Sequence, residues 1–129
     1  ARIEDVATGG GYNVSFQGSN SYFLSSRAEG IRSFYVLSLF KNEPKGCMYT
    51  MTAILGETEK DISKFLNDIN SASSYGNISK IGSNRIVFEN TVIIPYSTKE
   101  KLLVNIQLFA AEVRLTFMKL EEYLEQIHT

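Results

Sequence analysis

The sequence predicts an α+β protein in which helices pack on one face of an antiparallel sheet of about five strands. Three observations lead to this fold class. Segments of alternating apolar and polar residues come before and after one amphipathic helix. Short turns rich in glycine, serine and asparagine join these segments, which favours antiparallel pairing. A second and much longer helical pattern ends the chain.

The composition is that of a globular chain with little net charge. Hydrophobic residues make up 43% and charged residues 21% of the 129 positions, which argues against disorder. The 13 basic and 14 acidic side chains are scattered, so the basic patch of a nucleic-acid-binding protein is missing. No apolar run reaches the roughly 18 residues of a membrane span. We therefore expect a single domain over residues 1–129, with neither nucleic acid nor a membrane span.

The first eleven residues are predicted to form a short helix followed by a glycine linker. Residues 1–8 fit one or two helical turns. Three glycines then follow at 9–11, and they are too costly in conformational entropy to continue a helix. We expect a flexible hinge there.

About three or four strands are predicted before the central helix. Residues 12–17 and 21–26 alternate in polarity across a short turn, which indicates a hairpin. Residues 31–40 form a long apolar run with β-branched and aromatic side chains, as expected at the centre of a sheet. The next alternating segment, residues 47–55, adds a further strand.

The central helix is predicted from Thr58 to Gly76. Its apolar side chains fall on one stripe at i, i+3, i+4 and i+7, namely Ile62, Phe65, Leu66 and Ile69. Thr58 is placed to cap the free N–H groups, and Asp61 adds negative charge to the first turn. A helix with one apolar stripe has one side to bury, so we expect it to lie on the sheet.

A second hairpin and a long helix complete the chain. Residues 77–81 and 85–94 read as two strands around a short turn. Pro95 ends the sheet, and Ser97 with Glu100 forms a capping box that opens a helix reaching about Ile127. At 1.5 Å per residue this helix is roughly 45 Å long.

The long helix carries two apolar stripes on nearly opposite sides. The first stripe continues to the end of the helix and consists of Leu102, Ile106, Phe109, Val113, Phe117, Leu120, Leu124 and Ile127. The second stripe consists of Val104, Leu108, Ala111, Leu115 and Met118. One stripe can lie on the sheet, and the other stays exposed unless something covers it. We expect a homodimer or a partner polypeptide along the second stripe, the alternative being cover by the central helix or a hairpin of the same chain.

Cysteine and histidine are too few for most catalytic or metal sites. The lone Cys47 cannot form an internal disulfide, and with the lone His128 it cannot build a zinc site. His128 lies one residue from the end, where no base is held near a nucleophile. We predict no enzyme activity and no catalytic, metal or cofactor site. The sequence begins at Ala1 and leaves two locations open. These are the cytoplasm and, if Ala1 follows a removed signal peptide, the periplasm.

Residues 30–124 resemble the YbjN-like family of bacterial proteins, which are labelled sensory transduction regulators. The resemblance is carried by the segment FLNDINSASSYGNISKIGSNRIVFENTVII, with its matching positions at Leu66, Asn67, Asn70, Tyr75 and Gly76. It implies a fold like that of type III secretion chaperones and a chaperone-like or regulatory role. Because Asn67 and Asn70 are poor helix formers, we interpret one of them as a structural residue that hydrogen-bonds the following loop and strand.

Two functions of different classes follow. The first is a non-enzymatic protein-interaction module, chaperone-like or regulatory, that binds another polypeptide or itself. The alternative is a small-ligand-binding sensor domain with a pocket between sheet and helices. A large exposed apolar patch would favour the first function, and an enclosed polar pocket would favour the second.

Overall fold

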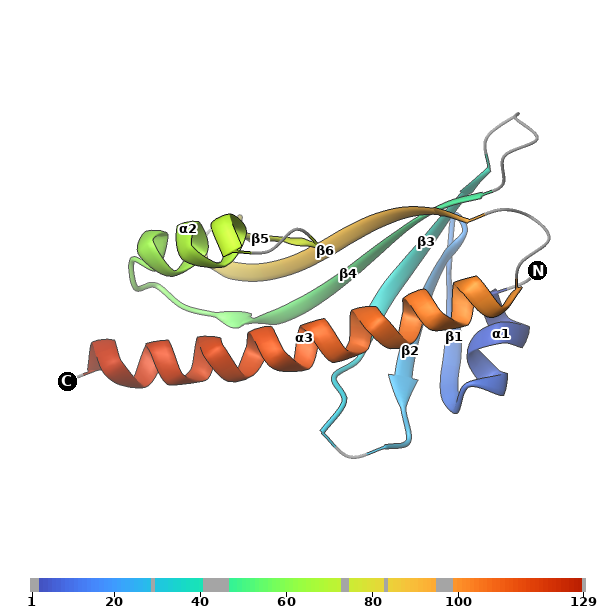
Figure 1. Ribbon diagram of the computed structural model, residues 1–129, viewed down its shortest axis with the longest axis horizontal. Helices are drawn as coiled ribbons and strands as arrows, with labels where there is room; N and C mark the ends of the chain where they lie inside the picture. The colour runs from blue at the N-terminus through green and yellow to red at the C-terminus, as the bar shows by residue number, and fades with distance from the viewer. Residues whose placement is uncertain are drawn as a thin grey trace.

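The computed structural model describes residues 3–28, 30–40, 47–72, 75–82, 84–94 and 99–128. Along the chain the elements are α1 (Ile3–Gly9), β1 (Tyr12–Gly18), β2 (Ser21–Ser26), β3 (Phe34–Phe40), β4 (Cys47–Glu57), α2 (Ser63–Ala72), β5 (Asn77–Ile81), β6 (Arg85–Ile94) and α3 (Lys99–His128). The helices lie on one face of the sheet, and α3 runs along the length of the molecule (Figure 1).

The six strands form one open antiparallel sheet in the order β1-β2-β3-β4-β6-β5. The predicted fold class is confirmed, with six strands where about five were expected. The first hairpin joins the main sheet because β2 pairs with β3 from Ser21↔Leu37 to Leu24↔Phe34. The second hairpin docks through β6, which pairs with β4 and leaves the short β5 at the edge. Strands β3 and β4 therefore occupy the centre, as the sequence predicted for β3.

Helix α2 begins five residues later than predicted, at Ser63 instead of Thr58. The hydroxyl of Thr58 accepts the N–H of Lys60 in a local turn (3.2 Å) and therefore does not cap the helix. Asp61 takes that place, because its carboxylate accepts the Ser63 N–H at 3.0 Å and the Ser63 hydroxyl at 2.6 Å. These hydrogen bonds lower the pKa of the Asp61 carboxyl.

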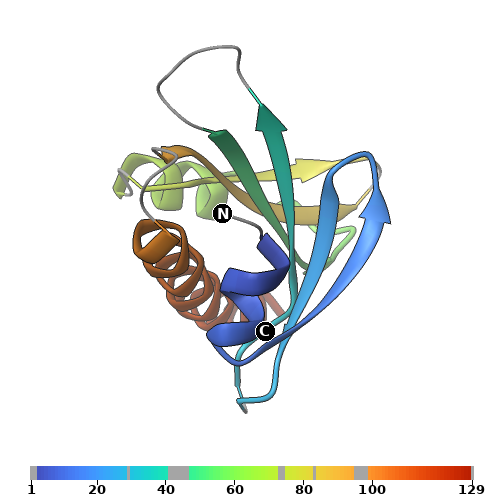
Figure 2. The ribbon, with the colours of Figure 1, turned by 90° about the vertical axis from the view of Figure 1, so that its right-hand side faces the viewer.

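The core lies between the inner face of the sheet and the three helices (Figure 2). Its centre is aromatic: the ring of Phe109 on α3 lies 5.0 Å from Phe34 of β3 and 5.7 Å from Phe88 of β6. Phe65 of α2 packs on Tyr123 of α3 at 5.1 Å and so joins the two helices. The predicted stripes of α2 and α3 thus meet in one core.

The glycines after α1 do more than form a flexible hinge, which corrects the prediction for residues 9–11. Helix α1 is docked through Ile3, Val6 and Ala7, all buried. Gly9 belongs to the helix, and a Cβ atom at Gly10 would lie 2.5 Å from Cδ1 of Leu103. A side chain at position 10 would therefore force Leu103 to shift, so glycine favours the close approach of α1 to α3.

Helix α3 spans 30 residues and ends at His128. The predicted helix cap at Ser97, together with Pro95, lies outside the described residues, as do the side chains of Cys47 and His128. In the described part of the chain, α3 and the other helices lack the combination of length and hydropathy that a membrane span needs.

Candidate functional site

One side of α3 carries an exposed row of apolar residues, here called the α3 stripe. Its members are those of the second predicted stripe: Val104, Leu108, Ala111, Leu115 and Met118. The four large side chains are 59%, 43%, 48% and 55% exposed in chain order. Cover by the central helix or a hairpin of the same chain, the alternative considered from the sequence, is therefore wrong for the described residues.

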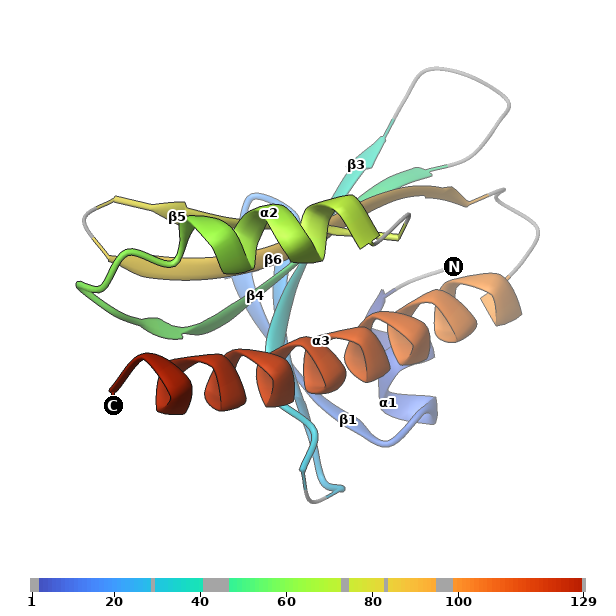
Figure 3. The same ribbon diagram turned by 60° about the vertical axis from the view of Figure 1, so that its left-hand side comes forward.

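The opposite side of α3 behaves as predicted. Leu102, Ile106, Phe109, Val113 and Leu120 are buried, and the last apolar residues of the first stripe are partly buried against the core. Helix α3 lies across the sheet (Figure 3). The buried residues place this side inward, and the exposed residues place the other side away from the sheet. The sheet can cover only one side of a helix, so the α3 stripe is left to solvent.

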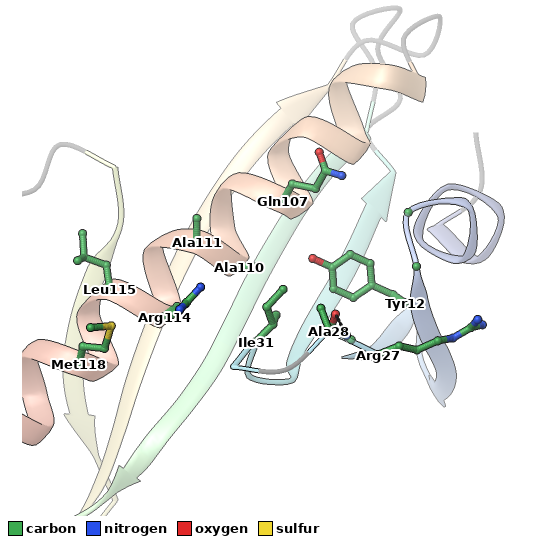
Figure 4. A pocket seen from close by; sticks show the side chains of 13 residues that line it. Tyr12, Arg27, Ala28, Ile31, Gln107, Ala110, Ala111, Arg114, Leu115 and Met118 are labelled. Atoms are coloured by element: carbon green, nitrogen blue, oxygen red, sulfur yellow. Dashed lines mark hydrogen bonds between the residues drawn. The ribbon is translucent and has the colours of Figure 1, made fainter.

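A groove of about 650 Å³ runs beside the α3 stripe, between α3, the start of β1 and the connection from β2 to β3 (Figure 4). Ala111, Leu115 and Met118 of the stripe contribute to one wall of the groove. Val104 and Leu108 lie outside it, farther toward the N-terminal end of α3. The structure thus brings three of the five predicted interface residues into a concave site and leaves two on the adjoining exposed surface.

Two glycines direct the chain around the groove: Gly11 lines its opposite wall, and Gly30 lies in the connection from β2 to β3. Gly11 has a φ of 90°, a conformation that favours glycine, and it turns the chain from α1 into β1 so that Tyr12 is buried. Gly30 has a φ of 79°, and a Cβ atom there would lie 3.8 Å from Cζ of Arg114. The connection from β2 to β3 therefore passes close to the guanidinium group of α3.

The groove is mainly apolar, with polar groups at a few positions. The Tyr12 hydroxyl points toward α3, and Ile31 lies between Tyr12 and Arg114 (Figure 4). Burial raises the pKa of the Tyr12 phenol. The phenol O–H can donate a hydrogen bond into the groove. Arg27 points away from the groove, and its Nε donates to Oδ1 of Asn13 at 3.4 Å.

The lining of the groove supplies groups that can bind a partner. The described residues that line the groove include no carboxylate, cysteine or histidine. An apolar wall with a phenol, an amide and a guanidinium group can accept an apolar side chain and hydrogen-bond a neighbouring carbonyl.

The sequence suggested a pocket between sheet and helices as an alternative, but the groove residues outside the α3 stripe were not predicted. Gln107 and Arg114 flank the α3 stripe on the same helix, so helical spacing alone could have indicated them. Tyr12 and Ile31 come from other elements, and no local pattern marks them as neighbours of α3.

The motif behind the family resemblance is structural. The Nδ2 atom of Asn70 donates to the carbonyl of Ile78, and the Ile78 N–H donates to Oδ1 of Asn70, both at 2.8 Å. Asn67 is exposed on α2. A Cβ atom at Gly76 would lie 2.5 Å from Cζ of Phe88, so this glycine allows close packing. The prediction that one of the two asparagines hydrogen-bonds the following strand is confirmed for Asn70.

Comparisons with known proteins support the fold. No family model matches the sequence, and neither does any curated protein. The element order and the open six-stranded sheet with its helices define a YbjN-like α+β fold. One solved structure that this chain resembles is YbjN from E. coli, described as a proposed transcription regulator. Its crystal structure matches with a TM-score of 0.64 over 95% of this chain and 90% of that chain, at 9% sequence identity.

Proposed function

We propose that the protein is a non-enzymatic regulatory or chaperone-like module that binds a polypeptide through the α3 stripe and the adjoining groove. One observation carries this proposal: four large apolar side chains, 43% to 59% exposed, lie in one row on α3. Contiguous apolar surface of this kind is uncommon on monomers and usually marks an interface.

The shape of the site supports a polypeptide partner. The α3 stripe spans 15 residues of helix, which is roughly 20 Å and matches the apolar face of a partner helix or an extended segment. The groove at its C-terminal half adds a recess in which a large side chain can anchor. The net charge of −1 supports a polypeptide over a nucleic acid.

The description of the structural counterpart agrees with this function. YbjN is a proposed transcription regulator, and regulators act by binding other molecules. The fold is shared while the sequence identity is 9%, so the support for this chain comes mainly from its own exposed surface.

The double variant Leu108→Glu with Leu115→Glu tests the proposal. Both side chains are exposed, so the variant should fold, whereas two carboxylates in an apolar interface should weaken binding at least about tenfold. Affinity capture from the native cell, followed by mass spectrometry, identifies the bound proteins. Binding of the purified chain to each captured protein, and to itself, is then measured by titration.

The matched control is Gln17→Glu with Asn77→Glu, which adds the same charge at exposed positions on the two edge strands. Binding that survives in the α3 variant but is lost in the control would reject the α3 stripe as the interface. Circular dichroism on all three proteins shows that the fold is retained.

A small-ligand sensor is the second candidate, and the groove is the observation that favours it. Its volume of about 650 Å³ falls in the range of ligand pockets, roughly 300 to 1,000 Å³. Ala28→Trp, at an exposed position that lines the groove, should obstruct a ligand while leaving Val104 and Leu108 unchanged. A small molecule released on denaturing the wild type, and absent from Ala28→Trp, would favour the sensor.

A further inference from the structure

We propose that the polypeptide on the α3 stripe is a second copy of this chain, with the two α3 helices packed antiparallel. This inference rests on the proposed function, because it names the partner of the same surface. It follows from the spacing of the stripe, from the side of α3 that the sheet leaves uncovered, and from the charges at the two ends of the stripe.

The stripe has the spacing of a coiled-coil seam. Its members follow one another at intervals of four, three, four and three residues, which are the a and d positions of a heptad. In the same frame, the b, c and f positions are the ones that the rest of the chain buries or partly buries: Leu102, Leu103, Ile106, Phe109, Ala110, Val113, Thr116, Phe117 and Leu120. The a and d side of a helix meets the partner helix in a coiled coil. In α3 this is the side that no described element of the chain covers.

The charges at the two ends of the stripe oppose a parallel pair. Lys101 and Glu122, both exposed, continue the heptad at the a positions before Val104 and after Met118. In a parallel pair each a residue meets its own copy, so lysine would face lysine and glutamate would face glutamate. At the flanking g and e positions, Arg114 would lie beside Lys119 of the second copy, which is a further like-charge contact. Like charges at these places destabilise the pair.

An antiparallel pair removes these conflicts. With the twofold axis between residues 109 and 110, Leu108 lies opposite Ala111 of the second copy, and Val104 lies opposite Leu115. Lys101 then lies opposite Met118, one helical turn from Glu122 of the second copy, where the two charges attract. By symmetry this attraction occurs twice.

The antiparallel register with the axis nearer the C-terminus carries like-charge contacts. With the twofold axis at residue 113, Glu112 would lie beside Glu112 of the second copy, and Arg114 beside Arg114 of the second copy. These two like-charge contacts count against the axis at residue 113.

A charge exchange tests this arrangement in the full chain. Sedimentation equilibrium should show a monomer–dimer equilibrium for the wild type. Lys101→Glu alone and Glu122→Lys alone should each raise the dissociation constant roughly tenfold, since each converts two attractive contacts into repulsive ones. The variant carrying both changes should return to within about threefold of the wild type.

Distance measurement tests the orientation independently. In a background with Cys47→Ser, a single nitroxide label is placed at the exposed position Glu125. Two labels related by the proposed axis should lie about 45 to 50 Å apart, whereas a parallel pair would place them within about 20 Å.

The outcomes separate this inference from the proposed function. A dimer without rescue by the charge exchange, or with the short label distance, overturns the antiparallel arrangement. A wild type that stays monomeric up to about 100 μM overturns the second copy as partner. The proposed function is decided separately, because a different captured protein that is lost from Leu108→Glu with Leu115→Glu would still confirm the α3 stripe as its binding surface.

Discussion

Phe109→Ala is expected to lower the free energy of unfolding by about 3 to 5 kcal/mol. The ring of Phe109 is fully buried between Phe34 and Phe88, with ring centroids 5.0 Å and 5.7 Å away. Truncation removes the contacts that join α3 to the inner strands β3 and β6, and rigid aromatic neighbours cannot close the cavity completely. Denaturant unfolding monitored by circular dichroism measures the loss.

The preceding residue provides the control. Leu108 is 43% exposed on the α3 stripe, so Leu108→Ala should cost less than about 1 kcal/mol in dilute solution, where self-association does not contribute. Equal losses for the two variants would mean that α3 does not lie on the sheet in the described orientation. The comparison therefore also tests which side of α3 is available to a partner.

Asn70→Ala is expected to cost about 2 to 3 kcal/mol of folding stability. The Asn70 amide forms two hydrogen bonds of 2.8 Å with the backbone of Ile78, one to the carbonyl and one from the N–H. Alanine would leave the partly buried carbonyl and N–H groups of Ile78 without the Asn70 amide as a hydrogen-bond partner. Since these bonds fix the end of α2 to the start of β5, thermal unfolding should begin at a lower temperature.

Asn67→Ala is the matched control, because Asn67 lies one helical turn earlier and is exposed. It should change the free energy of unfolding by less than about 0.5 kcal/mol. Neither asparagine touches the α3 stripe or its groove, so partner binding should be unchanged in both variants. Lost binding with unchanged stability in Asn70→Ala would reverse its assignment as a structural residue.

The two stripes of α3 show why periodic elements could be predicted from the sequence. Each residue of a helix advances by 100°, so spacing alone separates Phe109 from Leu108 and assigns them to different sides. The same reasoning placed the strands, because alternation of side chains is a local property. The bounds of the second hairpin, residues 77–81 and 85–94, agree with the structure for this reason.

Helix caps and glycines were less predictable. Thr58 and Asp61 are both good capping residues, and the choice between them depends on where the chain leaves β4. Gly10 was predicted to be part of a hinge because nothing near it in the sequence indicates a close contact. The side chain that packs against it, Leu103, is more than 90 positions away in the sequence.

By itself, the sequence determined the fold class, the helices and strands, and the existence of an apolar row on α3, since all of these follow from periodicity along the chain. Only the tertiary structure decided that β6 lies between β4 and β5, that no described element covers the α3 stripe, and that Tyr12 and Ile31 face Arg114 across a groove. These features depend on contacts between residues far apart in the sequence, and such contacts are set by how the elements pack together.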